Sequence, residues 1–143
     1  MRLLPLTQVS QRRLGTFDSI LMLGNNLGLV GNPRRARWLL RRFHRMTTDA
    51  ARIIAGTRDP YRTDVPEHLA YHVRNRARGR MPGQARIRVR YRRYAGPWID
   101  LLMLSPKELG SLLQGSGWAA TRFIGVEKGP YVAILEKDGS HST

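Results

Sequence analysis

The sequence predicts an α/β fold built as one domain over residues 1–143. An apolar run, an amphipathic segment and a second apolar run follow one another between residues 17 and 57, which is the order of a strand–helix–strand crossover. A helix-start signal and two further β-type runs close the chain between residues 105 and 137. Together they indicate a mixed sheet with parallel strands and an antiparallel C-terminal hairpin. We expect a partial three-layer sandwich of this kind, plus an inserted β-hairpin.

The first strand is expected at residues 17–23, FDSILML, where only Asp18 and Ser19 are polar. A nearly continuous apolar run suits a buried parallel strand. Asn32 and Pro33 then give an N-cap and a first helical residue. Apolar residues recur every three or four positions after them, which predicts a helix lying on the sheet: Ala36, Leu39, Leu40, Phe43 and Met46. The second strand is expected at residues 51–57, ARIIAGT.

The insertion is expected at about residues 60–104. A short helix is predicted to begin after Asp64, and residues 79–83 form a loop. Residues 86–91 alternate between arginine and apolar side chains, which is typical of a strand. Ala95-Gly96-Pro97 is predicted to turn this strand back into WIDLLML.

The last elements carry specific end signals. Ser105 and Glu108 have the spacing of a capping box, with Pro106 at the first helical position. Leu109, Leu112 and Leu113 are expected to be buried. The runs AATRFIGV and YVAILEK, joined by EKGP, predict the closing hairpin, and the tail from Asp138 onward is expected to be irregular.

Composition excludes several classes of function. The chain has no cysteine, so disulfides, thiolate nucleophiles and zinc–thiolate sites are excluded. His68 and His72 are four residues apart, but they lack the glutamate-containing context of a metalloprotease helix, so no metal site is predicted. There is no run of eighteen apolar residues and no signal-peptide layout at residues 1–13. We therefore expect a cytoplasmic protein without a membrane partner.

The net charge of +15 is concentrated in the first two thirds of the chain. Residues 74–93 contain nine arginines and no acid. Three interpretations stay open: a solvated outer face in a protein from a GC-rich, arginine-rich genome, a basic lid that selects an anionic substrate, or a nucleic-acid-binding strand with Tyr91 and Tyr94 available for stacking.

Five segments in order resemble the C-terminal half of class I S-adenosylmethionine-dependent methyltransferases, from about residue 3 to residue 137. They are FDSILMLGNN, NPRRARWLLRRFHRM, ARIIAGTRDP, SPKELGSLLQGSGW and the hairpin ending GPYVAILEK. The resemblance implies a Rossmann-like sheet and S-adenosyl-L-methionine as the cofactor. It also implies that Leu23, Gly24, Asn25 and Asn26 flank the methyl donor at the end of the first strand. The alternative is an ordinary strand-to-helix turn, in which Gly and Asn only tolerate left-handed backbone angles.

Some parts of the family's donor site have no counterpart here. No glycine-rich turn precedes Phe17, and residues 1–15 contain no acid to hold the donor's ribose or adenine. The resemblance therefore implies a truncated enzyme that binds the donor weakly or not at all. A second implication is a partner, either a separately encoded N-terminal half or another copy of the chain, that pairs with the exposed first strand.

The expected reaction is methyl transfer to a nucleophile of a small molecule. Asp59 and Tyr61 are candidate catalytic residues because they follow the end of the second strand, and His72 is a candidate general base. The base itself stays unknown. Tyr61, Tyr91, Arg93 and Trp98 are candidate substrate contacts, and His68 is a further candidate. For each residue a purely structural role is the alternative. The alternatives to the enzyme as a whole are a basic nucleic-acid-binding module that uses Arg74–Arg93 and a split subunit without activity of its own.

Overall fold

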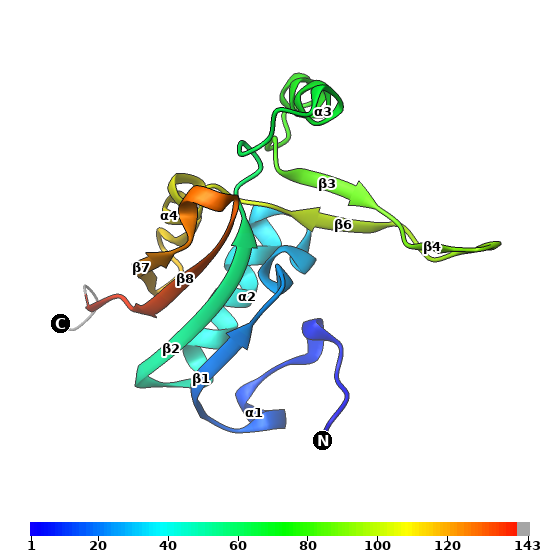
Figure 1. Ribbon diagram of the computed structural model, residues 1–143. Coiled ribbons are helices and arrows are strands. Elements are labelled where there is room, and N and C mark those ends of the chain that lie inside the picture. The colour runs from blue at the N-terminus through cyan, green and yellow to red at the C-terminus, as the bar shows by residue number, and fades with distance from the viewer. Residues whose placement is uncertain (140–143) are drawn as a thin grey trace.

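The computed structural model describes residues 1–139 (Figure 1). The part of the predicted irregular tail at residues 140–143 lies outside the described residues. The main sheet has four strands in the order β1-β2-β8-β7 and contains both parallel and antiparallel pairs. The predicted α/β class with a mixed sheet is confirmed.

The crossover is built as the sequence predicts. Strand β1 (Phe17–Met22) pairs in parallel with β2 (Thr47–Arg58), and helix α2 (Pro33–Arg45) connects them. Asn32 caps α2, because its side chain accepts a hydrogen bond from the backbone N–H of Arg35. The register places Met22 opposite Ala55, so the carboxyl ends of both strands reach the same edge of the sheet.

The C-terminal hairpin completes the sheet. Strand β8 (Pro130–Lys137) runs antiparallel both to β2 and to β7 (Trp118–Ile124). The 3-10 turn η3 (Val126–Lys128) joins the two hairpin strands between Gly125 and Gly129, which both have positive φ. Helix α4 (Pro106–Leu113) precedes the hairpin and has the predicted capping box.

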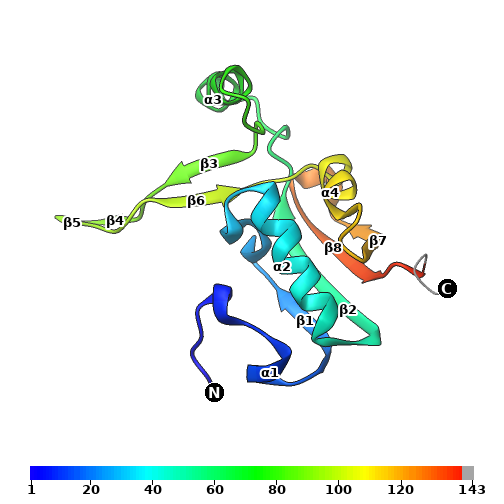
Figure 2. The ribbon, with the colours of Figure 1, turned by 180° about the vertical axis from the view of Figure 1, so that it is seen from behind.

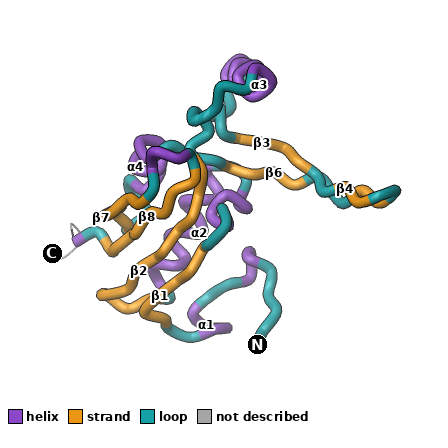
Figure 3. The backbone as a smooth tube through the Cα atoms, in the orientation of Figure 1, coloured by secondary structure: helices purple, strands orange, loops and turns teal. Residues whose placement is uncertain are grey.

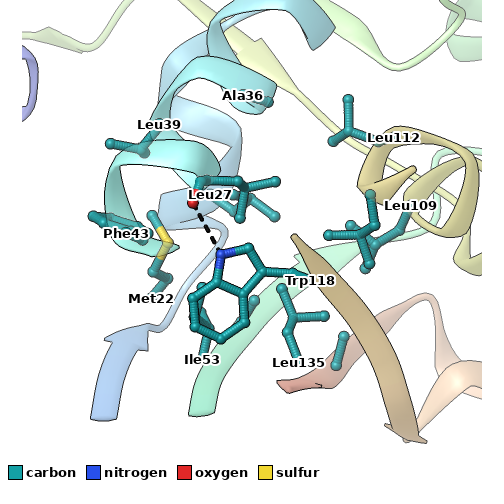
Figure 4. Close-up of a cluster of buried hydrophobic side chains, with 14 of the residues drawn as sticks. Met22, Leu27, Ala36, Leu39, Phe43, Ile53, Leu109, Leu112, Trp118 and Leu135 are labelled. Atoms are coloured by element: carbon teal, nitrogen blue, oxygen red, sulfur yellow. Dashed lines mark hydrogen bonds between the residues drawn. The ribbon is translucent and has the colours of Figure 1, made fainter. Parts of the chain in front are cut away.

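Helices α2 and α4 lie on one face of the sheet, and the core is between them and the strands (Figure 2). The predicted apolar stripes of both helices are buried there. Trp118 is 2% exposed, and its indole Nε1–H donates to the backbone carbonyl of Leu40 at 2.9 Å (Figure 4). Burying each leucine, isoleucine, phenylalanine or methionine side chain of this core contributes about 1.5–3 kcal/mol.

The opposite face of the sheet is not covered by any helix of the described residues, and it carries a row of apolar side chains beside the exposed ion pair of Arg52 and Glu136. The strand register aligns Leu21, Ile54 and Ile134 across β1, β2 and β8 on this face, and Leu21 is 62% exposed. Within residues 1–139 the outer edge of β1 has no strand partner. The described residues therefore supply the sheet and one helical layer of the predicted sandwich.

The insertion contains one helix and a long two-stranded arm. Helix α3 (Pro66–Ala77) extends beyond the short helix predicted from the sequence. Strand β3 (Gln84–Ile87) pairs with β6 (Ile99–Leu102), and β4 (Arg90–Tyr91) pairs with β5 (Tyr94–Ala95). We call residues 84–102 the arm. It extends away from the main sheet in both ribbon and tube views (Figures 1 and 3).

The predicted position of the arm's turn is wrong. The chain reverses at Arg92 and Arg93, where Arg92 has a φ of 54°, and not at Ala95-Gly96-Pro97. Gly96 instead follows β5 on the returning strand side of the hairpin, where its N–H donates to the carbonyl of Val89 at 2.8 Å. The pairing of Tyr91 with Tyr94 overrides the local turn preference of Gly-Pro.

The N-terminal segment packs beside α2. It contains the 3-10 turn η1 (Leu6–Gln8) and the short helix α1 (Gln11–Leu14). Arg42 of α2 fixes it by donating to the carbonyls of Thr7 and Val9 at 2.8 and 3.0 Å. No helix within residues 1–139 is long and apolar enough to cross a membrane.

Candidate functional site

The backbone of the turn after β1 agrees with the ordinary strand-to-helix turn as well as with a donor-binding turn. Gly24 and Asn25 both have left-handed backbone angles, with φ of 62° and 64°. The N–H of Asn26 closes the turn on the carbonyl of Leu23 at 3.2 Å, and the 3-10 segment η2 (Asn26–Val30) follows. A glycine on the neighbouring strand permits this turn to come close, since a Cβ on Gly56 would lie 3.2 Å from the backbone nitrogen of Gly24.

The side chain of Asn25 is held on two sides. Its Oδ1 accepts a hydrogen bond from the hydroxyl of Thr57 on β2 at 2.8 Å. Its amide also lies over Gly28, where an added Cβ would be 2.7 Å from Nδ2 and would meet the carbonyl oxygen of Leu102 on β6. Asn25 therefore links the turn after β1 to the end of β2, and the missing side chain of Gly28 lets Leu102 of β6 come close to the same turn.

These residues line a shallow pocket of about 400 Å³ at the carboxyl end of β1 and β2. The lining comprises Gly24, Asn25, Gly56, Thr57, Arg58, Ile124, Pro130, Tyr131 and Val132. We call this the strand-end pocket. Leu23 and Asn26, the other two predicted cofactor contacts, are exposed beside it and do not line it.

Asp59 follows β2 and organises the chain where the insertion begins. Its Oδ1 accepts a hydrogen bond from the N–H of Tyr61 at 2.9 Å, and Arg62 Nε lies 3.9 Å from its Oδ2. Its own N–H donates to the carbonyl of Gly129 in the closing hairpin at 2.9 Å. The buried carboxylate thus fixes the turn that leads into the insertion.

Tyr61 bridges the insertion to α4. Its hydroxyl donates to Glu108 Oε1 at 2.5 Å, while Glu108 Oε2 accepts the N–H of Ser105 in the capping box. Burial, followed by the hydrogen bond to Glu108 and its negative charge, raises the pKa of Tyr61 to about 12, although Arg76 acts in the opposite direction. The phenol is therefore protonated near neutral pH and acts as a donor, not as a base.

His72 lies beside Tyr61 in the insertion. It is 6% exposed, and the two rings meet edge to face with centroids 5.8 Å apart. Burial is the main cause that lowers the pKa of His72 below its usual value, and the positive charges of Arg76 and His68 add to it, while Glu108 opposes. A neutral imidazole at physiological pH can accept a proton.

A second pocket of about 550 Å³ lies between the end of β2, α3 and β3. We call it the insertion pocket. Asp59, His68 and His72 line it, and Arg58 lines both this pocket and the strand-end pocket. The structure therefore brings Asp59 and His72 to one cavity adjacent to the predicted cofactor turn. Tyr61 does not line this cavity, and it lines a separate pocket together with Glu108. In the described residues no group of three metal-ligating side chains is close enough to hold a metal ion.

The other predicted substrate contacts lie on the arm, outside both pockets. Tyr91 and Trp98 are 66% and 55% exposed, and Arg93 is exposed at the turn. Trp98 is covered in part by Arg86 and Arg88, whose guanidinium carbons lie 5.9 and 4.8 Å from its ring centroid. These three assignments remain predictions.

Four contributors were missed from the sequence: Gly56, Thr57, Arg58 and Glu108. The first three end the second strand, and pairing the ends of two parallel strands would have placed them beside Gly24 and Asn25. Glu108 was assigned only to the capping box, although its second oxygen serves Tyr61. No sequence pattern signals that bond, because Tyr61 and Glu108 are 47 residues apart.

Comparison with known proteins identifies solved structures that have a similar fold. No protein-family model and no curated protein matches the chain. Among solved structures, it is similar to an S-adenosylmethionine-dependent methyltransferase from Bacteroides fragilis in complex with S-adenosyl-L-homocysteine, with a TM-score of 0.65 and 23% identity over 85% of this chain and 48% of that one. The CcbJ methyltransferase from Streptomyces caelestis gives a TM-score of 0.64 at 10% identity, covering 96% of this chain and 63% of that one.

A third similar structure is an S-adenosylmethionine-dependent methyltransferase from Clostridium acetobutylicum ATCC 824, with a TM-score of 0.61 and 6% identity over 95% of this chain and 63% of that one. The chain thus spans between about half and two thirds of the length of these structures. The fold implied by the five ordered segments is confirmed.

Proposed function

We propose that this chain, which has the fold of S-adenosylmethionine-dependent methyltransferases, serves in methyl transfer from S-adenosyl-L-methionine to a nucleophile of a small molecule. The observation that carries the proposal is the turn Leu23–Asn26, clamped through Asn25 to the neighbouring strand at the carboxyl edge of the parallel pair. Ligands of open α/β sheets bind at this edge. The similar Bacteroides fragilis methyltransferase is in complex with S-adenosyl-L-homocysteine, the product form of the donor.

The backbone of the turn that lines the strand-end pocket supports donor binding there. A Cβ on Gly24 would meet nothing within 4 Å, so the backbone of the turn is open to a ligand. Asn25 presents an amide already fixed by Thr57, which lowers the entropy lost on binding. When bound, S-adenosyl-L-methionine supplies an activated methyl group on a sulfonium centre.

The insertion pocket is the proposed acceptor site. His72 would remove the proton from the acceptor's nucleophile, because burial keeps its imidazole neutral. Tyr61 would keep His72 in place through their edge-to-face contact and would hold α3 to α4 through Glu108. Asp59 would act on the acceptor side by fixing the turn between the two pockets.

Donor binding by residues 1–143 tests the proposal. We expect weak affinity for S-adenosyl-L-homocysteine, because no glycine-rich turn precedes β1 within these residues. Calorimetry should detect little or no heat, and micromolar affinity would show this expectation to be wrong. Amide chemical shifts resolve weaker binding: saturable shifts should be confined to residues 23–26 and 56–58. If saturating ligand leaves those amides unchanged, the proposed function fails.

A second candidate function is nucleic-acid binding by the arm. Arg86 and Arg88 stack on the exposed ring of Trp98, and Arg92 stacks on Tyr91 at 5.3 Å. Arg88 Nε is also the one buried side-chain nitrogen or oxygen of the described residues that has no hydrogen-bond partner. Arginine and aromatic side chains on one surface are typical of sites that bind single-stranded nucleic acid.

Salt dependence separates this function from the first. If the arm engages six or more phosphates, the affinity for random RNA or DNA should fall by about three orders of magnitude or more between roughly 50 and 200 mM salt. At constant salt concentration, Trp98→Ala should weaken nucleic-acid binding by about 1–3 kcal/mol relative to the unmodified chain if a base stacks on the ring. Affinity that is undetectable at the lower salt concentration would exclude the arm as a nucleic-acid site.

A further inference from the structure

We infer that the insertion pocket binds an oxyanion, and that the methyl acceptor is therefore a small molecule carrying a phosphate or carboxylate group. This inference rests on the proposed function and names the class of acceptor for the same site. It begins from the side chains that line the pocket and that the methyl-transfer argument did not use.

Four arginines line the pocket from separate parts of the chain. Arg58 ends β2, Arg62 lies in the following turn, Arg74 is on α3 and Arg86 is on β3. The acids of the lining are Asp59 and Glu67. The lining therefore has more positive than negative side chains, even when His68 and His72 are not counted.

Two of these arginines are partly neutralised and two are not. Arg62 Nε lies 3.9 Å from Asp59, and Arg86 Nε lies 3.7 Å from Asp100. Arg58 and Arg74 have no acidic partner within 4 Å among residues 1–139. Their guanidinium groups are therefore available for a ligand, and planar guanidinium forks suit the paired oxygens of phosphate and carboxylate.

The walls that carry these arginines are fixed to each other. Asn75 is 3% exposed, and its amide Nδ2 donates to the carbonyls of Pro82 and Gln84 at 3.1 and 2.8 Å. The hydroxyl of Tyr71 accepts the N–H of Arg86 at 3.1 Å, and Arg74 lies 5.5 Å above the Tyr71 ring. Helix α3 and strand β3 therefore hold the backbone that carries Arg74 and the Tyr71 ring beneath its guanidinium, which reduces the entropic cost of binding.

The remaining lining suits a small molecule with one charged end. Pro60, Pro82, Ala85, Ile87 and Met103 give the pocket an apolar part. Its volume of about 550 Å³ lies within the 300–1,000 Å³ typical of small-molecule sites. The arginines at the tip of the arm do not line it. Because Arg58 also borders the strand-end pocket, an anion bound here would lie next to the predicted donor turn.

The test is an amide chemical-shift titration of the 143-residue chain with inorganic phosphate and, separately, with malonate, at constant ionic strength. We expect saturable shifts at residues 58–62 and 66–74, and none at residues 90–94. Saturation by phosphate alone assigns a phosphorylated acceptor, and saturation by malonate alone assigns a carboxylate. No saturation with either probe, or shifts centred on the arm tip, would overturn the inference.

Charge-neutral variants then assign the binding to specific arginines. Arg58→Gln and Arg74→Gln should each weaken the affinity for the active probe at least about tenfold, or roughly 1.4 kcal/mol. Arg90→Gln removes the same charge from the arm tip, outside the pocket, and should leave the affinity unchanged. Equal weakening by all three would show diffuse attraction and overturn the inference. Circular dichroism shows whether each variant is folded. If one of the two pocket variants does not fold, the affinity of the other one decides the result.

This experiment needs no methyl donor, so its outcome is independent of the proposed function. Saturable anion binding without any response to S-adenosyl-L-homocysteine at residues 23–26 would support the oxyanion pocket and contradict the proposed methyl transfer. The reverse pattern would keep methyl transfer and remove the oxyanion pocket.

Discussion

At the scale of single residues, Asn25 has both a structural and a proposed functional role. Its left-handed backbone forms the turn, and its side chain joins β2 through Thr57. The bond to Thr57 is part-buried, so its loss leaves a polar oxygen without a protein donor. The conformation of the turn should therefore depend on a residue of the neighbouring strand.

Thr57→Val tests this dependence. The change keeps the shape of the side chain and removes the hydroxyl, so we expect the free energy of unfolding to fall by about 1 kcal/mol. Urea denaturation measures the effect. Thr121→Val is the matched control, because that hydroxyl is exposed and makes a longer bond of 3.3 Å to Ile134. An equal loss in both variants would contradict a special role for Thr57.

His72 should make the stability of the protein depend on pH. Its pKa in the folded protein is lowered from 6.5, so the unfolded chain binds more protons as the pH falls below that value. Stability should therefore decrease on acidification through this range, by at most about 1.4 kcal/mol per pH unit for one proton.

His72→Gln should flatten that part of the pH profile, measured by urea unfolding at several pH values. His68→Gln, one helical turn away and exposed, should retain most of the slope, because burial and not the charge of His68 is the main cause of the lowered His72 pKa. A slope that is the same in His72→Gln and in the wild type would assign the pH dependence to other groups.

At the scale of elements, α4 was the most completely predicted part of the fold. Ser105, Pro106 and Glu108 specify its start locally, and the structure has both hydrogen bonds of the capping box. The helix α2 is similarly determined by its Asn-Pro start and its apolar stripe. Where the residues that interact are three or four positions apart, the sequence alone is sufficient to predict the start of the helix and its buried face.

Ser105→Ala measures the strength of that local signal. Removing the cap should reduce the free energy of unfolding by about 1 kcal/mol, and denaturant unfolding measures it. Ser111→Ala in the same helix is the control, since its exposed hydroxyl only bonds back to Lys107 and alanine is the better helix former. A Ser111→Ala variant as destabilised as Ser105→Ala would refute the cap as the cause.

The arm and the pockets depend on contacts between distant residues, and here sequence reasoning was less complete. Gly96 and Pro97 have turn chemistry, but the ladder between Tyr91 and Tyr94 places the reversal three residues earlier. Likewise, the sequence shows Arg58 and Arg74 only as two of many arginines. The positions of α3 and β3 in the fold bring them to the same cavity. Their common location depends on tertiary packing, which leaves no periodic signal.

At the scale of the whole molecule, the sheet of the described residues has β1 and β7 as its edge strands and has no helix on one face. Strand β1 is a largely apolar edge strand that carries the exposed Leu21, and such a strand is a ready site for pairing with another chain. The expectation from the sequence, that β1 takes an N-terminal half or a second copy as its partner, remains a prediction. Light scattering of residues 1–143 should show association, and Leu21→Lys should reduce it. A stable monomer in the unmodified chain would contradict the need for a partner.

The strand order has one more consequence. Strands β1 and β2 precede the arm and β7 and β8 follow it, yet β2 and β8 are neighbours over seven residue pairs from Arg52 to Arg58. Trypsin should cut first at exposed Arg92 or Arg93, where the arm reverses. The two fragments should then co-elute on gel filtration and separate only in denaturant, so this protein should tolerate being made as two pieces that assemble through their shared sheet.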